Sequence, residues 1–566
     1  MARSKPKRSP AKKVDRQRLK PTEGVRAQRP GRMGLQGALA AAVLGAAIVF
    51  GGILRVYGAS ASPTIINDEG ISLLAATGHQ GEYAQVVKES RFPYGSWCKS
   101  AQWRRFILPE RRFCFGTISS DLARYDLHPP LYFWFLHVWL LIWGLAPSTA
   151  LSLNLIFFAA SAVGLFLVGV YALGRRFEAA AAVMVWSCSP NVIPIAYQAR
   201  QYELLALCTI WFTLAVLRCT SRSKPPKTWH WIALGLISGA GLLVHYHFVI
   251  ALTGGGVYTL LHLARHHRGR LALGLLSIYM GAGLANVAHP VIKHVQAKSK
   301  KLGSQSVSPK ARLRKCSNRY RAFLMDDGKK LSRPVERQYS RWFPYVFGGL
   351  CAAMAALGKY RRVTGSAPDD AKHARVGALL FFLIWYAAGN IALYVSGLSP
   401  PHAMAAKYPC MAWPFAGLLL VILTRPLLRW RVPVQLLLCG AMALSGSMHV
   451  RWDVSPSQRL KIDSIRLPWF TPLIVDDASR LRLPRLLFRL GDDVSMLVAH
   501  PNVLLSTYDQ WSAGLAGQNR YLGYDRSGKV SQTSRQLFGR LQRDFVIENG
   551  PYGIAGYNIY VGLSRK

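Results

Sequence analysis

Charged residues are scarce in this chain of 566 residues, and their scarcity argues against a soluble globular protein. They make up 17% of the sequence, against roughly 25% in soluble globular proteins. Hydrophobic residues make up 51%, and the mean hydropathy is +0.16. Long apolar runs recur, with the charges gathered between them, and about 20 apolar residues are enough for a helix to span a bilayer. The composition therefore excludes a string of soluble domains and predicts a polytopic membrane protein.

Acidic residues are the scarcer kind of charge, with 26 Asp and Glu against 71 Lys and Arg and a net charge of +45. Such an excess can indicate a nucleic-acid partner. Here, however, much of the positive charge lies in an N-terminal tail, in short connectors and in one long loop. This distribution is typical of membrane proteins, whose basic connectors face the cytoplasm and whose basic segments attract anionic head groups. We therefore expect anionic lipids, and no nucleic acid, as partners.

Paired cysteines and nucleotide-binding patterns are also missing. The nine cysteines form no CxxC pair, and no convincing glycine-rich phosphate-binding pattern follows a strand-like run. Most of the cysteines lie in apolar runs, where a thiol behaves as a small hydrophobic group. Cys98 and Cys114 instead lie in a polar loop, which we place outside the cytoplasm, where disulfides persist. We predict a disulfide between them, with two free thiols as the alternative.

The N-terminal part of the chain divides into a tail, a span and a polar loop. Residues 1–33 are rich in Lys, Arg, Pro and Ser and predict a disordered, basic, cytoplasmic tail. Residues 34–54 form the first apolar span, and Ala59-Ser60-Ala61 follows it. We favour an uncleaved helix over a signal peptide, because a long basic stretch precedes the span. The outer loop 55–148 contains the short aromatic run 129–144, which we interpret as an interfacial helix.

Later apolar runs bring the predicted number of transmembrane helices to about eleven. When they are placed by charge, all of their inner connectors are basic. The further spans are 149–173, 178–196, 199–217, 229–246, 248–264, 271–289, 342–358, 376–396, 408–424 and 432–448.

Two segments differ from the helical domain, which is predicted to cover residues 34–449. Residues 290–341 fall on the outer face in this scheme although they are dense in Lys and Arg, and long loops can cross a membrane regardless of charge. Residues 450–566 mix short apolar runs with Gly, Asp and Asn turns. They predict a small soluble α/β domain on the extracytoplasmic side. The expected fold class is thus an all-α polytopic membrane protein with a C-terminal α/β domain.

Two adjacent carboxylates, Asp68 and Glu69, follow the first span at the outer interface. Such a pair suits a catalytic base and a metal ligand or orienting group. A solvated turn or a helix N-cap is the alternative, because surface carboxylates are common.

Ionisable and aromatic residues recur at the outer ends of later spans. His128 and Tyr132 flank the proline-led start of the interfacial run, and Arg200 and Glu203 lie in the turn between two spans. The planar fork of an Arg binds phosphate well. Interfacial anchoring would explain each residue alone, but ionisable groups at membrane depth are functional by default.

His245 and Lys407 lie at two later outer turns. An interfacial His and a Lys that reaches toward the head groups are the alternatives, whereas the functional interpretation is contact with a phosphate. Every one of these groups falls on the same side of the membrane, and this convergence predicts a site there.

In this order, these residues resemble the GT-C superfamily of membrane glycosyltransferases. The similarity is to the branch that contains protein O-mannosyltransferases, lipid A aminoarabinose transferases and rhizobial lipopolysaccharide-core sugar transferases. It covers roughly residues 34–425. The motifs are Asp68-Glu69, His128-Pro129-Pro130-Leu131-Tyr132, Ala199-Arg200-Gln201-Tyr202, His245-Tyr246 and Lys407-Tyr408 followed by Pro414.

The resemblance implies many helices with interfacial helices in the first outer loop, a polyprenyl-phosphate-sugar donor and an inverting transfer. Asp68 would be the general base and Glu69 its neighbour. The residues implied at the donor phosphate are His128, Tyr132, Arg200, Tyr202, His245 and Lys407. Two residues depart from the family pattern. Lys407 stands where an Arg is usual, and a Lys cannot bind phosphate in the bidentate geometry of an Arg. Glu203 is not expected in the turn where it lies.

The resulting prediction is an envelope glycosyltransferase of a bacterial inner membrane, with its site on the periplasmic face. The acceptor, a glycan, lipid or protein, stays open, and so does the cofactor, for which a divalent metal ion held by Asp68 and Glu203 is one candidate. A transporter or flippase of a lipid-linked sugar is the alternative function. It explains the spans and the basic loop but not the paired carboxylates, and the repeated halves common in transporters are not evident.

Overall fold

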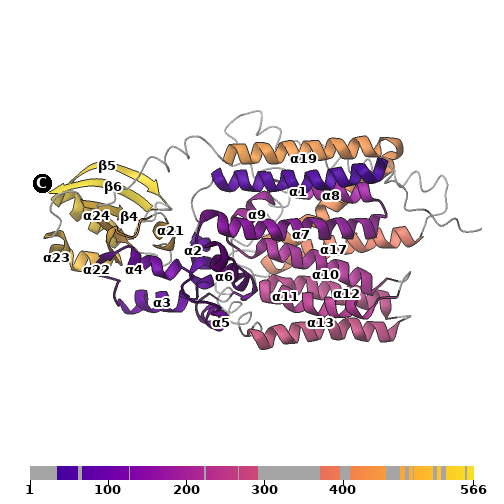
Figure 1. Cartoon of the computed structure of the whole chain (residues 1–566), viewed down its shortest axis with the longest axis horizontal. Helices are drawn as coiled ribbons and strands as arrows, with labels where there is room; N and C mark the ends of the chain where they lie inside the picture. The colour runs from indigo at the N-terminus through magenta and orange to yellow at the C-terminus, as the bar shows by residue number, and fades with distance from the viewer. Residues whose placement is uncertain are drawn as a thin grey trace, which may run out of the picture.

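The structure is a computed structural model that places a helical bundle at one end, a β-sheet at the other and short helices between them (Figure 1). The predicted tail 1–33, the span 342–358, Lys407 and nearly all of the loop 290–341 lie outside the residues that it describes. The described residues are 35–61, 67–126, 128–221, 225–264, 267–290, 293, 370–395, 408–453, 472–477, 483–488, 490–513, 519–523, 531–554 and 557–565.

Within the described residues, seven helices of the bundle are long and apolar enough to cross a membrane. The two longest have 27 residues each, about 40 Å at 1.5 Å per residue, which exceeds the roughly 30 Å of the hydrocarbon core. The seven are α1 (Leu35–Ala61), α7 (Pro147–Leu173), α10 (Tyr202–Cys219), α13 (Arg268–Ala288), α17 (Asp370–Val395), α18 (Trp413–Leu423) with its flanking turns η4 (Tyr408–Met411) and η5 (Arg425–Trp430), and α19 (Arg431–Asp453). In Figure 1 the labelled helices among them, α1, α7, α10, α13, α17 and α19, run along the long axis of the molecule.

Shorter helices fill other positions where the sequence predicted spans. They are α8 (Arg176–Ser187), α9 (Ile193–Tyr197), α11 (Thr228–Val244) and α12 (Val249–Leu263), the last preceded by the turn η3 (Tyr246–Phe248). The prediction of one continuous span over 178–196 is wrong, because the helix ends at Ser187 and a second begins at Ile193. Pro190 lies in the break, and a proline cannot donate the hydrogen bond that would continue the helix.

Glycines allow α11 and α13 to cross closely. A Cβ atom at Gly281 would lie 2.0 Å from the carbonyl oxygen of Gly235, and one at Gly239 would lie 2.8 Å from that of Gly281. Small residues at helix crossings are the usual means of packing inside a membrane, where lipid is as apolar as the side chains. These three positions therefore fix how near the two helices lie.

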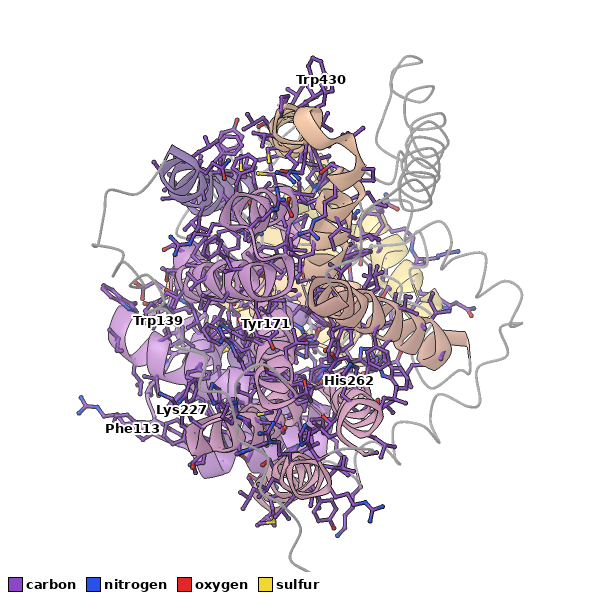
Figure 2. All side chains as sticks on the ribbon, turned by 90° about the vertical axis from the view of Figure 1, so that its right-hand side faces the viewer. Phe113, Trp139, Tyr171, Lys227, His262 and Trp430 are labelled. Carbon is purple, nitrogen blue, oxygen red and sulfur yellow. The ribbon has the colours of Figure 1, made fainter. Side chains whose placement is uncertain are left out.

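One carboxylate holds two predicted inner connectors together at the far end of the bundle. Glu178 is almost fully buried, and its Oε2 atom accepts bonds from Nε (2.9 Å) and Nη2 (2.7 Å) of Arg425. Nε of Arg431 lies 3.3 Å from Oε1, and Nε of Arg175 lies 3.8 Å from it. Figure 2 views the molecule from this end, with Trp430 of η5 at its edge. The connectors around residues 175 and 425–431 thus lie at one end, as their charge predicted.

The first outer loop folds into short helices at the opposite end of the bundle. They are α2 (Asn67–Ala76), α3 (Gln80–Glu89), α4 (Ala101–Arg104), the turn η1 (Arg105–Ile107), α5 (Phe115–Asp121), the turn η2 (Leu122–Asp126) and α6 (Leu131–Trp143). Helix α6 corresponds to the run predicted as interfacial. Nδ1 of His137 on α6 lies 2.7 Å from the carbonyl oxygen of Ala76. The imidazole thereby satisfies a carbonyl at the C-terminal end of α2.

The C-terminal strands join a strand of the first outer loop in one six-stranded sheet, with the order β1-β3-β2-β4-β6-β5. Strand β1 (Trp97–Lys99) pairs antiparallel with β3 (Ser495–Ala499), and β2 (Leu473–Asp476) lies parallel between β3 and β4 (Asn519–Gly523). The antiparallel strands β5 (Phe545–Ile554) and β6 (Tyr557–Arg565) complete it. The accompanying helices are α21 (Leu483–Leu487), α22 (Pro501–Ser506), α23 (Tyr508–Ala513) and α24 (Gln532–Asp544).

The predicted Cys98–Cys114 disulfide is wrong for this structure, because both thiols are free. Sγ of Cys98, on β1, lies 3.8 Å from the carbonyl oxygen of Met496. Sγ of Cys114 lies 3.8 Å from the carbonyl oxygen of Thr77 and 3.8 Å from Nε2 of His137. Strand pairing with β3 therefore holds one thiol, while the contact with α2 and α6 holds the other.

Reducing agent is accordingly expected to leave the melting temperature of the purified protein unchanged, and alkylation of the denatured, unreduced protein should label Cys98 and Cys114 in full. Loss of a native disulfide typically costs about 2–5 kcal/mol, so its presence would be obvious in the melting curve. Mass spectrometry of the labelled peptides makes the measurement, with a fully reduced sample as the control. A peptide pair linked through these two residues would contradict the structure.

Candidate functional site

Helix α2 brings its two carboxylates to its first turn, at the end of the bundle next to the first outer loop. Asp68 is partly exposed, whereas Glu69 is buried. Acidic residues are favourable in the first turn of a helix because the free N–H groups there carry partial positive charge. Oε1 of Glu69 accepts a hydrogen bond of 3.0 Å from the backbone N–H of Ala199. Glu69 therefore ties α2 to the turn that precedes α10.

Arg200 makes the second connection between the same two segments. Its Nη1 atom donates to the carbonyl oxygen of Asp68 and to Oγ of Ser72, each at 3.3 Å. Its Nη2 atom lies 3.3 Å from Nε2 of His128. The side chain is only 5% exposed, so its charge lies where solvent screens it weakly. A fixed, weakly screened guanidinium of this kind is suited to bind an anion.

The contacts of His128 fix its tautomer. A guanidinium only donates, so Nε2 of His128 accepts from Arg200. The proton of the neutral ring then lies on Nδ1, which is 2.9 Å from Oδ2 of Asp126. Protonation of Nε2 would remove this acceptor and place two cations side by side. The neutral imidazole is therefore the form that suits these contacts.

His245 adjoins His128, and Tyr202 in turn adjoins His245. The ring centroid of His245 lies 6.4 Å from that of His128 and 5.7 Å from that of Tyr202. Nδ1 of His245 accepts a bond of 3.0 Å from the backbone N–H of His247, so the proton of the neutral ring lies on Nε2. The turn between α11 and α12 thus adds a donor group to the cluster.

Two buried residues, Tyr132 and Asn154, support the cluster. Tyr132, on α6, is completely buried, and its hydroxyl lies near the side chain of Asn154 and within the electrostatic influence of Glu69 and Arg200. Nδ2 of Asn154 donates to the carbonyl oxygens of Ala196 (3.0 Å) and Gln198 (2.7 Å). These bonds fix the backbone of the turn that carries Arg200.

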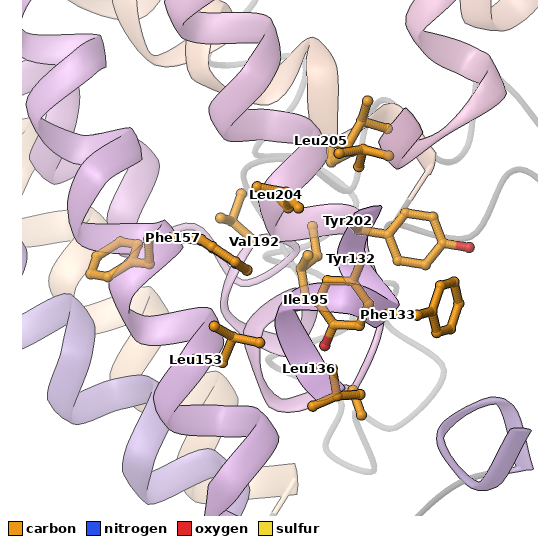
Figure 3. Packing of buried hydrophobic residues seen from close by; sticks show 14 of the residues in the cluster. Tyr132, Phe133, Leu136, Leu153, Phe157, Val192, Ile195, Tyr202, Leu204 and Leu205 are labelled. Carbon is orange, nitrogen blue, oxygen red and sulfur yellow. The ribbon is translucent and has the colours of Figure 1, made fainter. Parts of the chain in front are cut away.

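Apolar residues of α6, α7, α9 and α10 pack together next to this turn. Figure 3 shows Tyr132 and Leu136 with Leu153, Ile195 and Leu204, all of which are buried. The rigid packing of these side chains gives the polar groups above them a fixed platform.

Glu203 lies near a buried cation that the sequence analysis did not single out. It lies one residue into α10 and is buried, and its charge interacts with that of Arg55 on α1. Arg55 is fully buried and donates from Nη1 to the carbonyl oxygens of Gly51 (2.9 Å) and Ser187 (2.8 Å). Among the described residues, no group of three or more His, Cys, Asp or Glu is arranged to hold a metal ion. The suggested Asp68–Glu203 metal site therefore gains no third ligand of these types from that part of the chain.

The structure thus brings together nearly all of the residues that the sequence predicted for the site. The roles of these residues stay predictions. Lys407 lies outside the described residues. The assembled residues are Asp68, Glu69, His128, Tyr132, Arg200, Tyr202 and His245. Sequence reasoning missed three supporting residues, Asp126, Asn154 and Arg55. For Asn154 the signal was present, because it is an isolated polar residue inside an apolar run, and Asp126 stands two residues before His128.

A solved structure of similar architecture identifies the fold. ArnT from Cupriavidus metallidurans bound to undecaprenyl phosphate matches with a TM-score of 0.50 and 13% sequence identity, over 93% of this chain and 98% of that one. The same protein in the apo state matches with a TM-score of 0.44 and 15% identity, over 78% and 88% of the two chains. ArnT is a GT-C aminoarabinose transferase. The chain therefore shares the overall fold of this GT-C enzyme, the fold that the resemblance predicted.

The sequence itself gives a second, narrower match. Residues 127–290 match the family described as dolichyl-phosphate-mannose-protein mannosyltransferase. This segment runs from just before His128 to the end of α13 and so includes Tyr132, Arg200, Tyr202 and His245. No curated protein sequence matches the chain.

Proposed function

We propose that this protein transfers a sugar from a polyprenyl-phosphate donor to an acceptor of the cell envelope. One observation carries the proposal: the buried Arg200 guanidinium joins the backbone of the carboxylate-bearing helix α2 to His128 at one end of the bundle. A cation for a leaving phosphate and a carboxylate for an attacking hydroxyl thereby lie in one cluster. The undecaprenyl phosphate bound to the structurally similar ArnT supports a lipid-phosphate donor.

The proposed chemistry is one displacement with inversion. The carboxylate of Asp68, which is partly exposed, removes the proton of the acceptor hydroxyl while that oxygen attacks the anomeric carbon. The bond between this carbon and the donor phosphate oxygen breaks, and the lipid phosphate leaves with the electron pair. A positioned general base typically contributes about 10²–10⁴-fold to the rate.

The leaving phosphate develops negative charge, and the proposed donors oppose it. Arg200 supplies a fixed positive charge, and His245 supplies an N–H group in its neutral tautomer. Tyr202 and Lys407 complete the proposed set. Electrostatic stabilisation of this kind is commonly the largest contribution to catalysis. Glu69 is bonded to Ala199, so we assign it the positioning of α2 rather than proton transfer.

The proposed setting is the inner membrane of a bacterium, with the site on the periplasmic face. Basic connectors at the opposite end of the bundle support this orientation. A basic tail in residues 1–33, about eleven spans within residues 34–449 and an extracytoplasmic α/β domain in residues 450–566 complete the proposal. Anionic lipids remain the predicted partners of the loop 290–341.

Transfer in vitro tests the function directly. Purified protein in detergent or vesicles is incubated with a labelled polyprenyl-phosphate sugar and an extract of envelope acceptors. Label in an acceptor, with release of the polyprenyl phosphate, supports the proposal. Movement of the intact labelled lipid between leaflets without transfer would instead identify the alternative, a transporter.

Reporters of membrane sidedness give the expected topology. Fusions near residue 95 and residue 315 and at the C-terminus should report the periplasm, and a fusion near residue 223 should report the cytoplasm. The contrast is expected because residue 95 lies in the first outer loop, whereas the basic stretch around residue 223 is a predicted inner connector. Paired alkaline phosphatase and fluorescent-protein fusions make the measurement. A cytoplasmic signal near residue 315 would require the span count and the side of Lys407 to be revised.

A further inference from the structure

We infer that the C-terminal segment, residues 472–565, is a positioning element for α2, and that the carboxylates reach their working geometry only when this segment is docked. The inference rests on the proposed function, in which Asp68 on α2 is the general base. It concerns a part of the chain far from the cluster in sequence, whose role the proposed reaction leaves unassigned.

Strand β1 joins the first outer loop to the C-terminal segment. Trp97, Cys98 and Lys99 stand in register with Leu497, Met496 and Ser495 of β3. Backbone bonds continue the pairing on both sides. The N–H of Gly95 donates to the carbonyl oxygen of Val498 (2.9 Å), and that of Ser100 donates to Val494 (2.8 Å). The outer loop thus supplies the edge strand of the sheet.

Charged side chains extend the same junction. Nζ of Lys99 lies 3.1 Å from Oδ1 of Asp493, Arg104 pairs with Asp492, and the N–H of Ala101 donates to the carbonyl oxygen of Asp492 (3.0 Å). Exposed ion pairs contribute little to stability by themselves. The paired backbones therefore fix the position of the junction, and the charges only add to its specificity.

The apolar contact that reaches the site is made by α21. This helix packs against α2 and against α4, and Leu483, Leu486 and Leu487 on it are fully buried. On α2, Leu73 and Leu74 are buried in the same continuous core. Figure 1 shows α21 between the sheet and α2. Since α2 has only 10 residues and short isolated helices are marginal, it depends on its neighbours for its position.

The support of α2 is therefore divided. Arg200 and Glu69 hold its first turn, His137 holds its C-terminal end, and α21 covers its flank. Loss of the α21 contact would let the carboxylates shift, whereas Arg200 would stay in place because Asn154 holds its turn and His128 contacts its side chain. A displacement of about 1 Å in a catalytic group can cost on the order of 100-fold in rate. The C-terminal segment should thus affect turnover without affecting donor affinity.

A matched pair of truncations tests this assignment. Leu486→Ala shortens a buried side chain of α21, the helix that packs against α2, whereas Leu537→Ala shortens an equally buried leucine of α24, which packs against α22 and β5. We expect Leu486→Ala to lower the single-turnover rate by about 10- to 100-fold with the donor Kd unchanged. Leu537→Ala should lower the melting temperature similarly and leave the rate unchanged. Equal rate losses in both variants, or none in either, would overturn the inference.

Hydrogen exchange provides a readout that does not need activity. In Leu486→Ala the amides of residues 69–76 should exchange faster, and in Leu537→Ala they should match the wild type. If the wild type transfers no sugar while this difference is present, the proposed function fails and the positioning of α2 stands. If transfer occurs and the exchange of α2 is the same in both variants, the positioning fails alone.

A cross-linked variant tests the same inference if Leu486→Ala does not fold. Cys98 and Met496 are direct partners in the register, and opposed residues of antiparallel strands lie about 5.5 Å apart between Cα atoms, within the range that a disulfide spans. The Met496→Cys variant should transfer sugar slowly when both thiols are reduced, and it should regain its transfer rate when they are oxidised to a disulfide. Equal rates in the two redox states, with cross-linking verified by mass, would contradict the inference.

Discussion

Asp68→Asn is expected to lower the single-turnover rate of sugar transfer by about 10²–10⁴-fold, the usual contribution of a general base. The substitution keeps the size of the side chain and removes its basic oxygen. The Arg200 contact should survive, because the guanidinium donates to the backbone carbonyl of Asp68 rather than to its carboxylate. Donor binding should therefore persist, and a donor-affinity measurement beside the rate separates the two properties.

Glu69→Gln is the matched control for this experiment. Its amide oxygen can still accept the N–H of Ala199, which Oε1 of Glu69 accepts now, so the rate should fall much less. An Asp68→Asn protein with nearly normal turnover would contradict the assignment of the base. In that case Asp68 would be a helix cap, a role in which Asn is about as good.

Arg200→Ala should weaken donor binding by about 10- to 100-fold, which corresponds to the roughly 1.5–3 kcal/mol of a hydrogen bond to a charged group. Turnover should fall as well, because the same side chain joins Ser72 on α2 to His128. Titration with polyprenyl phosphate gives the Kd, and a single-turnover assay gives the rate.

The control for charge loss is Arg540→Ala. Arg540 pairs with Asp509 in the C-terminal segment (2.7 Å) and should not affect donor affinity. Comparable Kd values in the wild type and in Arg200→Ala would show that the phosphate binds elsewhere.

Side-chain chemistry and order along the chain predicted most of the cluster, because each predicted residue lies at the outer end of a helix. The charge rule alone placed Asp68, Arg200 and His245 on one side. The sequence could not show which atoms meet. That Arg200 contacts a backbone carbonyl, and that Asn154 fixes the Arg200 turn, depend on backbone positions that no spacing rule specifies.

The errors also have local causes. Pro190 divides a predicted span, and a single proline inside an apolar run is easily outweighed by the hydropathy around it. Cys98 and Cys114 were paired because they share a polar loop, but Cys98 belongs to a strand whose partner lies about 400 residues away, at Met496. Long-range strand pairing leaves no signal in the local pattern, so the sequence could not decide between the disulfide and the free thiols, and it could not indicate that β1 forms the edge of the mixed sheet.

The arginines around Glu178 also constrain how the chain is assembled. Glu178 is made 247 residues before Arg425, so at about 5–20 residues per second of synthesis it waits roughly 12–50 s for that partner. Of the arginines that lie within 4 Å of Glu178 in the folded protein, Arg175 is the first to be synthesised, three residues before Glu178. The helix pair α7 and α8 therefore enters the membrane with an incompletely neutralised carboxylate at its inner end. Arrival of Arg425 on η5 and of Arg431 at the start of α19 completes the set of charges and ties this early end of the bundle to its last helices.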